Sequence, residues 1–273
     1  MSQELIIEAG HAERQYWKDL WRYRELFLIL TWRDVAVQYK QTVVGILWAV
    51  LRPLLTMAAF TIVFNKIAKL PTEGEAPYAL MVFAAMLPWQ LFATSLAATA
   101  NSLVANSNLV SKVYFPRIIV PTATLGVAIV DFAISFVLLC GMMCWYQYLP
   151  PFQVLMVLPL TLLAGLVALG PGLILCALNV TYRDFRIIVP FITQFGLYIS
   201  PVGFSSSIVP EKWRLLYECN PMVGVIDGFR WAILGTTDFP GRALLISSVC
   251  AIVFLLAGIK VFRRTERTFA DVI

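Results

Sequence analysis

Residues 118–145 have the sequence IIVPTATLGVAIVDFAISFVLLCGMMCW, in which Asp131 is the one charged side chain. A helix rises 1.5 Å per residue, so about 20 apolar residues cross the hydrocarbon core of a bilayer. This stretch exceeds that length, which predicts a tilted helix or one that extends past the interface. Residues 118–145 therefore predict a membrane-spanning helix.

Five further apolar stretches accompany this one, at residues 42–64, 77–98, 152–178, 187–205 and 241–262. The chain of 273 residues is 60% hydrophobic and 14% charged, with a mean hydropathy of +0.78. Soluble domains carry about 25% charged residues. We therefore predict an all-α integral membrane protein with six transmembrane helices, and we exclude a soluble domain because every stretch would have to be a fully buried helix.

Lys and Arg residues are distributed unevenly between the two sets of loops. Fourteen lie in the N-terminal segment 1–41, the second and fourth connections and the C-terminal end, and six lie in the other connections. The positive-inside rule then predicts a multi-pass membrane protein with both termini in the cytoplasm. The net charge of +5 is explained by topology and by contact with anionic lipids, so no nucleic acid is expected as a partner.

Three segments outside the spans are predicted to be amphipathic. Residues 14–40, within a cytoplasmic leader at 1–41, predict a helix in the membrane interface, with a soluble helix packed on a partner as the alternative. Residues 99–117 predict a short cytoplasmic helix. Residues 205–240 predict two short re-entrant helices on the outer side, separated by Asn220 and Pro221. The membrane domain is expected to cover 42–262, followed by a cytoplasmic tail at 263–273.

The sequence lacks the residues that common membrane enzymes and ATPases need. No glycine directly precedes a lysine, so there is no Walker A motif to bind ATP. No acidic cluster near a span offers ligands for Mg²⁺, and the five cysteines have no metal-binding spacing. Away from the ends of the spans, charge is limited to Arg52 and Asp131, fewer ionisable groups than an ion-coupled carrier usually has. We expect no enzyme activity, no bound cofactor, and energy supplied by another subunit.

Several segments, spread over the chain in order, resemble one family. Together these segments make up about a third of the chain, and it is the ordered set that is specific. The chain resembles the membrane subunit of ABC-type polysaccharide exporters, which are type-2 export permeases for O-antigen, capsule or teichoic acid. The segments are WRDVAVQYKQTVVGILWAVLRPLL (32–55), NLVSKVYFPRIIVP (108–121), LNVTYRDFRIIVPFITQFGLYISPVGF (178–204), NPMVGVIDGFRWAILG (220–235) and FRRTERTFADVI (262–273).

The resemblance implies a homodimer of this chain with two copies of an ABC ATPase subunit, which binds ATP and Mg. It implies a substrate path between the two copies, lined by the first and fifth spans. Residues implied in ATPase coupling are Asn101, Asn108, Lys112, Tyr114, Arg117, Arg183, Asp184 and Arg186; for the arginines, fixing the topology is the alternative. Residues implied in the path are Trp48, Arg52, Phe60, Phe64, Phe191, Phe195 and Tyr198, and Pro221 and Met222 are implied in an outer gate.

The resemblance predicts ATP-driven export of a polyprenyl-diphosphate-linked polysaccharide across the inner membrane. Aromatic faces suit the CH surfaces of sugars, although lipid-facing or packed aromatics are an equal alternative. The guanidinium of Arg52 suits a diphosphate, and an ion pair within the bundle or contact with water remains open for it. The other hypotheses are a type-2 permease for a drug or another lipid and, as a weaker one, an enzyme acting on polyprenyl lipids.

Overall fold

A computed structural model describes residues 12–40, 43–70, 76–182, 184–235, 238–266 and 269. Nearly all of them are helical and none forms a strand, which confirms the predicted all-α class. The main helices are α1 (Ala12–Arg22), α2 (Arg24–Tyr39), α3 (Val43–Phe60), α4 (Tyr78–Ala105), α5 (Ser107–Lys112), α6 (Ile119–Ala123), α7 (Leu125–Trp145), α8 (Val157–Thr181), α9 (Phe185–Ile199), α10 (Glu211–Glu218), α11 (Pro221–Leu234) and α12 (Gly241–Glu266). Three short elements complete the order, η1 (Thr61–Ile67), η2 (Phe152–Met156) and η3 (Ser206–Ile208).

Five helical segments of the described chain are long and apolar enough to cross a membrane. They lie at Val50–Ile67, Tyr78–Ala105, Ile119–Trp145, Phe152–Thr181 and Gly241–Glu266. The predicted span at 187–205 corresponds to α9, a shorter apolar helix of 15 residues. The buried, non-helical residues 200–203 extend it.

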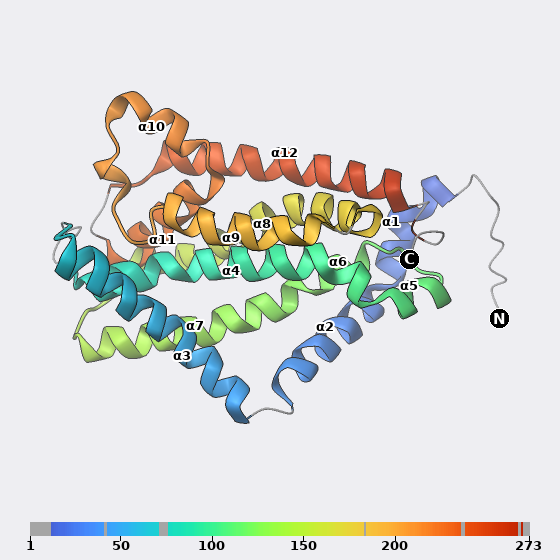
Figure 1. Cartoon of the computed structure of the whole chain (residues 1–273), viewed down its shortest axis with the longest axis horizontal. Helices are drawn as coiled ribbons and strands as arrows, with labels where there is room; N and C mark the ends of the chain where they lie inside the picture. Colours follow the sequence, from blue (N-terminus) through green and yellow to red (C-terminus); the bar gives the residue numbers. More distant parts are fainter. Residues whose placement is uncertain are drawn as a thin grey trace.

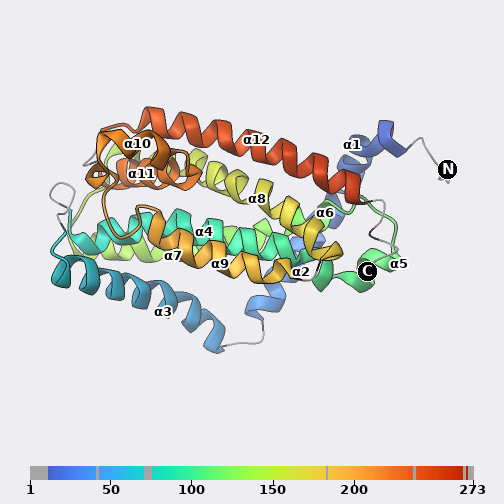
Figure 2. The same ribbon diagram turned by 45° about the horizontal axis from the view of Figure 1, so that its top comes forward.

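Both ends of the described chain lie at one end of the bundle (Figure 1). The hydroxyl of Tyr16 in α1 donates a hydrogen bond to Glu266, the last residue of α12, at 3.2 Å. An odd number of passes would place the termini at opposite ends, so α9 completes an even number of passes along the bundle. The helices α10 and α11 lie together at the opposite end (Figures 1 and 2). Six membrane crossings therefore stay our prediction.

The core forms around α4, most of whose residues between Tyr78 and Leu103 are buried. The helix packs against α7, α8 and α11. Small residues allow these close approaches: Ala164 and Ala168 of α8 are fully buried, and a side chain at Gly172 would collide with Thr99 of α4. In lipid, where apolar burial gives little gain, such close van der Waals contact holds helices together.

Two helix boundaries differ from the sequence prediction. The predicted helix at 14–40 breaks at Tyr23 into α1 and α2. The short helix predicted within 99–117 corresponds to α5, which has only six residues because α4 continues to Ala105. Polar groups in this part of α4 have partners inside the bundle: Ser102 donates to the carbonyl of Thr99 at 2.8 Å, and the carbonyl of Ala100 accepts from Asn179 of α8 at 2.8 Å.

Candidate functional site

At the end of the bundle that carries the termini, Tyr16 of α1 and Arg117 both contact Glu266, the last residue of α12. The backbone N–H of Arg117 donates to Oε1 of Glu266 at 2.8 Å, and Nη1 of Arg117 donates to the Glu266 carbonyl at 2.6 Å. Tyr16 donates to Oε2 of the same carboxylate. Beside these contacts lies a cavity of about 1070 Å³ between α1, the segment 113–117 and α12.

The hydroxyl of Tyr16 is kept neutral by its surroundings. Burial, followed by the nearby charge of Glu266, raises the pKa of Tyr16 well above its ordinary value. The guanidinium of Arg263 lies 4.7 Å from the centre of the Tyr16 ring, within the range of a cation–π contact. Tyr16 therefore donates a stable hydrogen bond at physiological pH and ties α1 to the end of α12.

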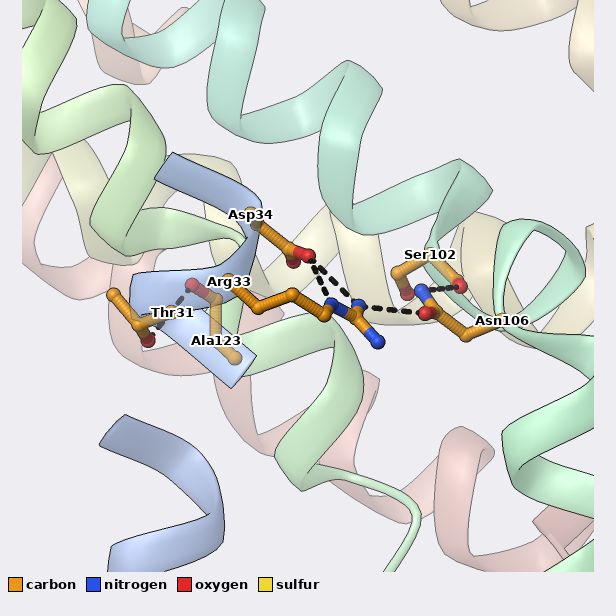
Figure 3. A network of polar contacts seen from close by, with 6 residues as sticks. All are labelled: Thr31, Arg33, Asp34, Ser102, Asn106 and Ala123. Atoms are coloured by element: carbon orange, nitrogen blue, oxygen red, sulfur yellow. Dashed lines mark hydrogen bonds and ion pairs between the residues drawn. The ribbon is translucent and has the colours of Figure 1, made fainter. Parts of the chain in front are cut away.

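A second network ties α2 to the junction of α4 and α5 (Figure 3). Nη2 of Arg33 donates to Oδ1 of Asp34 and to Oδ1 of Asn106, both at 2.7 Å. The amide of Asn106 donates in turn to the Ser102 carbonyl at 2.9 Å. Thr31, also on α2, donates to the carbonyl of Ala123 in α6 at 3.2 Å. Helix α2 is thus attached to both sides of the connection between α4 and α7.

The residues predicted for ATPase coupling fall into three groups. Asn108, Lys112, Tyr114, Asp184 and Arg186 are exposed at the end that carries the termini. Arg117 is partly buried by Glu266, and the amide of Asn101 donates to the Ala97 carbonyl of its own helix at 2.9 Å. Arg183 lies outside the described residues.

The sequence analysis did not select the residues that organise this end. Tyr16, Arg33, Asn106 and Glu266 join elements that are remote in the sequence. Glu266 lies in the tail segment FRRTERTFADVI, which carries part of the family resemblance, so the sequence marked this segment without singling out Glu266. Its partners were not detectable, because hydrogen-bond partners of a single carboxylate depend on how α1 and α12 pack.

The residues predicted for the path lie on α3, η1 and α9. Trp48, Phe191, Phe195 and Tyr198 are exposed, with 64% of Tyr198 accessible. Phe60 is only 8% accessible. The centre of its ring lies 6.2 Å from that of Tyr198 and 5.3 Å from that of Phe64, which is partly buried. Phe60, Phe64 and Tyr198 therefore form a group of neighbouring rings where α3 ends. Phe191, Phe195 and Tyr198 form an exposed strip along α9.

Arg52 and Asp131 line the same cavity, of about 570 Å³, between α2, α3, α4, α7 and α9. Asp131 accepts hydrogen bonds from α2, from the amide of Gln38 at 3.1 Å and from the hydroxyl of Tyr39. Burial and the hydrogen bond to Asp131 raise the pKa of Tyr39. Within the described chain, the hydrogen-bond partners of Asp131 thus come from the amphipathic helix, and Arg52 is exposed.

At the opposite end, the turn at residues 200–205 is held from several sides. The fully buried Arg230 of α11 donates to the carbonyls of Phe204 at 2.9 Å and Val202 at 3.1 Å. The hydroxyl of Tyr78, at the start of α4, donates to the Gly203 carbonyl. A side chain at Gly203 would collide with the rings of Phe60 and Phe64. The turn therefore links α3, α4, α9 and α11.

The residues predicted for an outer gate begin α11. Pro221 occupies its first turn, and the side chain of Asn220 accepts a hydrogen bond from the backbone N–H of Met222 at 3.1 Å. The amide of Asn220 donates to the hydroxyl of Ser200 at 3.0 Å. Met222 is 1% accessible, so in this conformation its side chain packs inside the chain.

Comparisons with known proteins agree with this architecture. The family model for the ABC-2 type transporter matches residues 25–234. The O-antigen export system permease protein RfbA of Klebsiella pneumoniae is 25% identical over 252 residues, which cover 91% of this chain and 95% of the relative. RfbA of Myxococcus xanthus is 27% identical over 257 residues, covering 93% and 97%.

A capsule exporter is also similar over most of the length. The capsule polysaccharide export inner-membrane protein CtrC of Neisseria meningitidis is 24% identical over 248 residues, which cover 87% of this chain and 90% of the relative. The residues matched by the family model include α3, α9, α10 and α11 and nearly all of α2. The family model spans most of the chain, and the protein therefore belongs to the ABC-2 type transporter family.

Proposed function

We propose that this chain is the membrane subunit of an exporter that moves a polyprenyl-diphosphate-linked polysaccharide across the inner membrane. A separate ATPase subunit, which binds ATP and Mg, supplies the energy. The observation that carries the proposal is similarity over nearly the whole length to permeases named for O-antigen and capsule export. No single segment accounts for these matches, because each covers 87% or more of this chain.

The proposed ATPase-docking surface is the end of the bundle that carries the termini. Its exposed residues Lys112 and Tyr114 belong to the connection between α4 and α7, so a force applied there acts on two long helices at once. The Glu266 contacts make α1 and α12 part of the same support. Both termini then face the cytoplasm, where ATP is available.

The proposed path runs between two copies of the chain, along α3 and α9. Both helices expose large aromatic side chains, among them Trp48, Phe195 and Tyr198, that the bundle of one chain does not cover. In a homodimer these faces would meet across a wet passage, and their amphipathic rings suit sugar surfaces. The start of α11, at Pro221 and Met222, would close the outer side.

The experiment that tests the function measures where lipid-linked polysaccharide accumulates in cells lacking this chain. We expect long polymer on its polyprenyl carrier at the cytoplasmic face and none at the surface, with export restored by the wild-type gene. Normal surface polysaccharide without accumulation would contradict the proposal and favour a permease for a drug or another lipid.

Coupling is tested separately with variants of the docking surface. Lys112→Glu combined with Tyr114→Ala should abolish export while membrane insertion and folding are retained, because both side chains are exposed. The matched control is Lys212→Glu, which reverses an exposed charge on α10 at the opposite end. Equal export by the docking variant and the control would contradict the assignment of this surface.

A further inference from the structure

Charged and amide side chains from four different helices meet at one place. They are Arg52 in α3, Gln90 in α4, Asp131 in α7 and Gln194 in α9. They are far apart in the sequence, yet all four line the cavity of about 570 Å³.

Polar groups at membrane depth are costly unless they meet polar partners, and they usually mark a functional site. Asp131 has partners, because Gln38 and Tyr39 donate to it. Within the described residues, the side chains of Arg52, Gln90 and Gln194 make no hydrogen bond to the protein. An arginine offers five N–H donors, and each glutamine offers two donors and an acceptor. The cavity therefore presents an unused set of donors and acceptors.

The walls of the cavity combine this polar set with aromatic rings. Trp48, Trp89 and Phe132 line it, and Thr56 and Ser135 add hydroxyl groups. Flat amides and a carboxylate suit pairs of sugar hydroxyls, aromatic faces suit sugar CH surfaces, and a guanidinium fork suits phosphate. The volume falls in the range of small-molecule sites, about 300–1,000 Å³. The cavity thus fits a head group better than a polymer.

The cavity lies in the middle of the bundle's length and extends toward the end that carries the termini. It is lined by Gln38 and Tyr39 at the end of α2, and by Ala128 and Asp131 in the first half of α7, which starts at that end. Figures 1 and 2 show the beginning of α3 standing away from the other helices, so the cavity is a wedge between α3 and the bundle. A lipid made on the side of the termini would reach it first.

We propose that this cavity binds the phosphate–sugar head group of a glycolipid. The guanidinium of Arg52 binds the phosphate. The amides of Gln90 and Gln194 and the free acceptor sites of the Asp131 carboxylate bind sugar hydroxyls, and the exposed ring of Trp48 covers one sugar face. The inference rests on the proposed function and specifies the part of the substrate that is recognised before translocation.

The test measures dissociation constants of the purified full-length chain in nanodiscs of phosphatidylethanolamine and phosphatidylglycerol. The probes share a farnesyl tail and carry diphosphate, diphosphoglucose, glucose or a bare hydroxyl. We expect diphosphoglucose to bind most tightly and the bare alcohol most weakly. Arg52→Gln should weaken both diphosphate probes by about tenfold or more, leaving the glucoside unchanged, and Arg52→Lys should recover part of the loss.

Gln90→Leu should show the opposite pattern, weakening both glucose-bearing probes and leaving farnesyl diphosphate unchanged. The matched control is Lys66→Gln, which removes an exposed cation at the far end of η1 and should alter no affinity. Equal binding of the alcohol and the diphosphoglucose, or equal effects of Arg52→Gln and Lys66→Gln, would overturn the site.

The outcome is separable from the proposed function. Lipid-linked polymer that accumulates in cells lacking the chain, together with unchanged affinities in the Arg52 and Gln90 variants, would retain the export function and refute the site. In the alternative outcome, the variants lose affinity as expected while cells lacking the chain keep normal surface polysaccharide. This pair of results would support the site and refute polysaccharide export.

Discussion

The two ends of the bundle differ in how deeply their polar contacts are buried. At the end with α10 and α11, buried or partly buried side chains donate to backbone carbonyls: Arg230 to residues 202 and 204, Tyr78 to Gly203, and Tyr148 to Leu234. An ion pair between Arg242 and Glu218 adds to these contacts. At the end with the termini, contacts join charged side chains that are partly accessible, such as Arg33 with Asp34 and Asn106.

The difference follows from the environment of each contact. A buried carbonyl that loses its donor costs its full desolvation energy, whereas an exposed ion pair competes with water and contributes little. The end with α10 and α11 thus contains the contacts that cost most to break. The other end can exchange its contacts for those of a partner, which suits the proposed docking surface.

The sharpest test of this contrast is Arg230→Met. The variant leaves the buried carbonyl of Val202 and the partly buried carbonyl of Phe204 without this donor. At about 1–3 kcal/mol for a buried group, we expect the largest loss in the free energy of unfolding, measured by SDS titration. Lys212→Met, on the exposed face of α10, is the matched control and should change little. A stability of Arg230→Met equal to that of the control would break the contrast.

The next largest effect is expected from Gly224→Ala in α11. A methyl group at Gly224 would collide with the backbone carbonyl of Ala243 in α12, so the two helices must separate, at a cost of about 1–3 kcal/mol. Gly165→Ala in α8 is the control, because nothing lies within 4 Å of the added methyl. The same unfolding assay should show no loss for Gly165→Ala; equal losses would argue against close packing of α11 on α12.

A smaller effect is expected from Tyr16→Phe at the end with the termini. The variant removes one hydrogen bond to Glu266 and keeps the ring, so about 0.5–1.5 kcal/mol of unfolding free energy should be lost. Tyr146→Phe changes an exposed tyrosine at the end of α7 and serves as the control. A loss as large as that of Arg230→Met would show that this end is equally rigid.

The smallest effect is expected from Arg33→Ala. The ion pair with Asp34 is exposed to solvent, so its loss should change the unfolding free energy by at most about 1 kcal/mol. Raising the salt concentration should reduce the difference further, because salt screens exposed charges. A large effect that persists at high salt would mean that this contact organises the fold.

Much of the fold could be predicted from residue types alone. The apolar stretches at 118–145 and 241–262 correspond to long helices, because the hydropathy of a span is a sum over its own residues. The end of α4 was mispredicted, because Ser102 has a partner inside its own helix and Asn179 of α8 reaches the backbone of α4. Local polarity suggested a break that tertiary contacts removed.

The candidate sites, like the fold, could be predicted from the sequence only in part. The resemblance selected Arg52 and the aromatic residues of α3 and α9, and their roles stay predictions. The sequence did not indicate that Gln90 and Gln194 belong with Arg52, since each is an isolated amide in a different helix. It also treated Arg230 only as one positive charge in an outer loop, although the structure buries it completely.

By itself, the sequence determined that this protein is a helical membrane protein with basic residues concentrated on one side, because hydrophobicity and charge act residue by residue. Only the tertiary structure decided which polar side chains meet. The approach of Arg52, Gln90, Asp131 and Gln194 depends on the rotation and packing of four helices, and the burial of Arg230 depends on a turn that another helix presents to it. Such relations between distant segments arise only when the helices assemble.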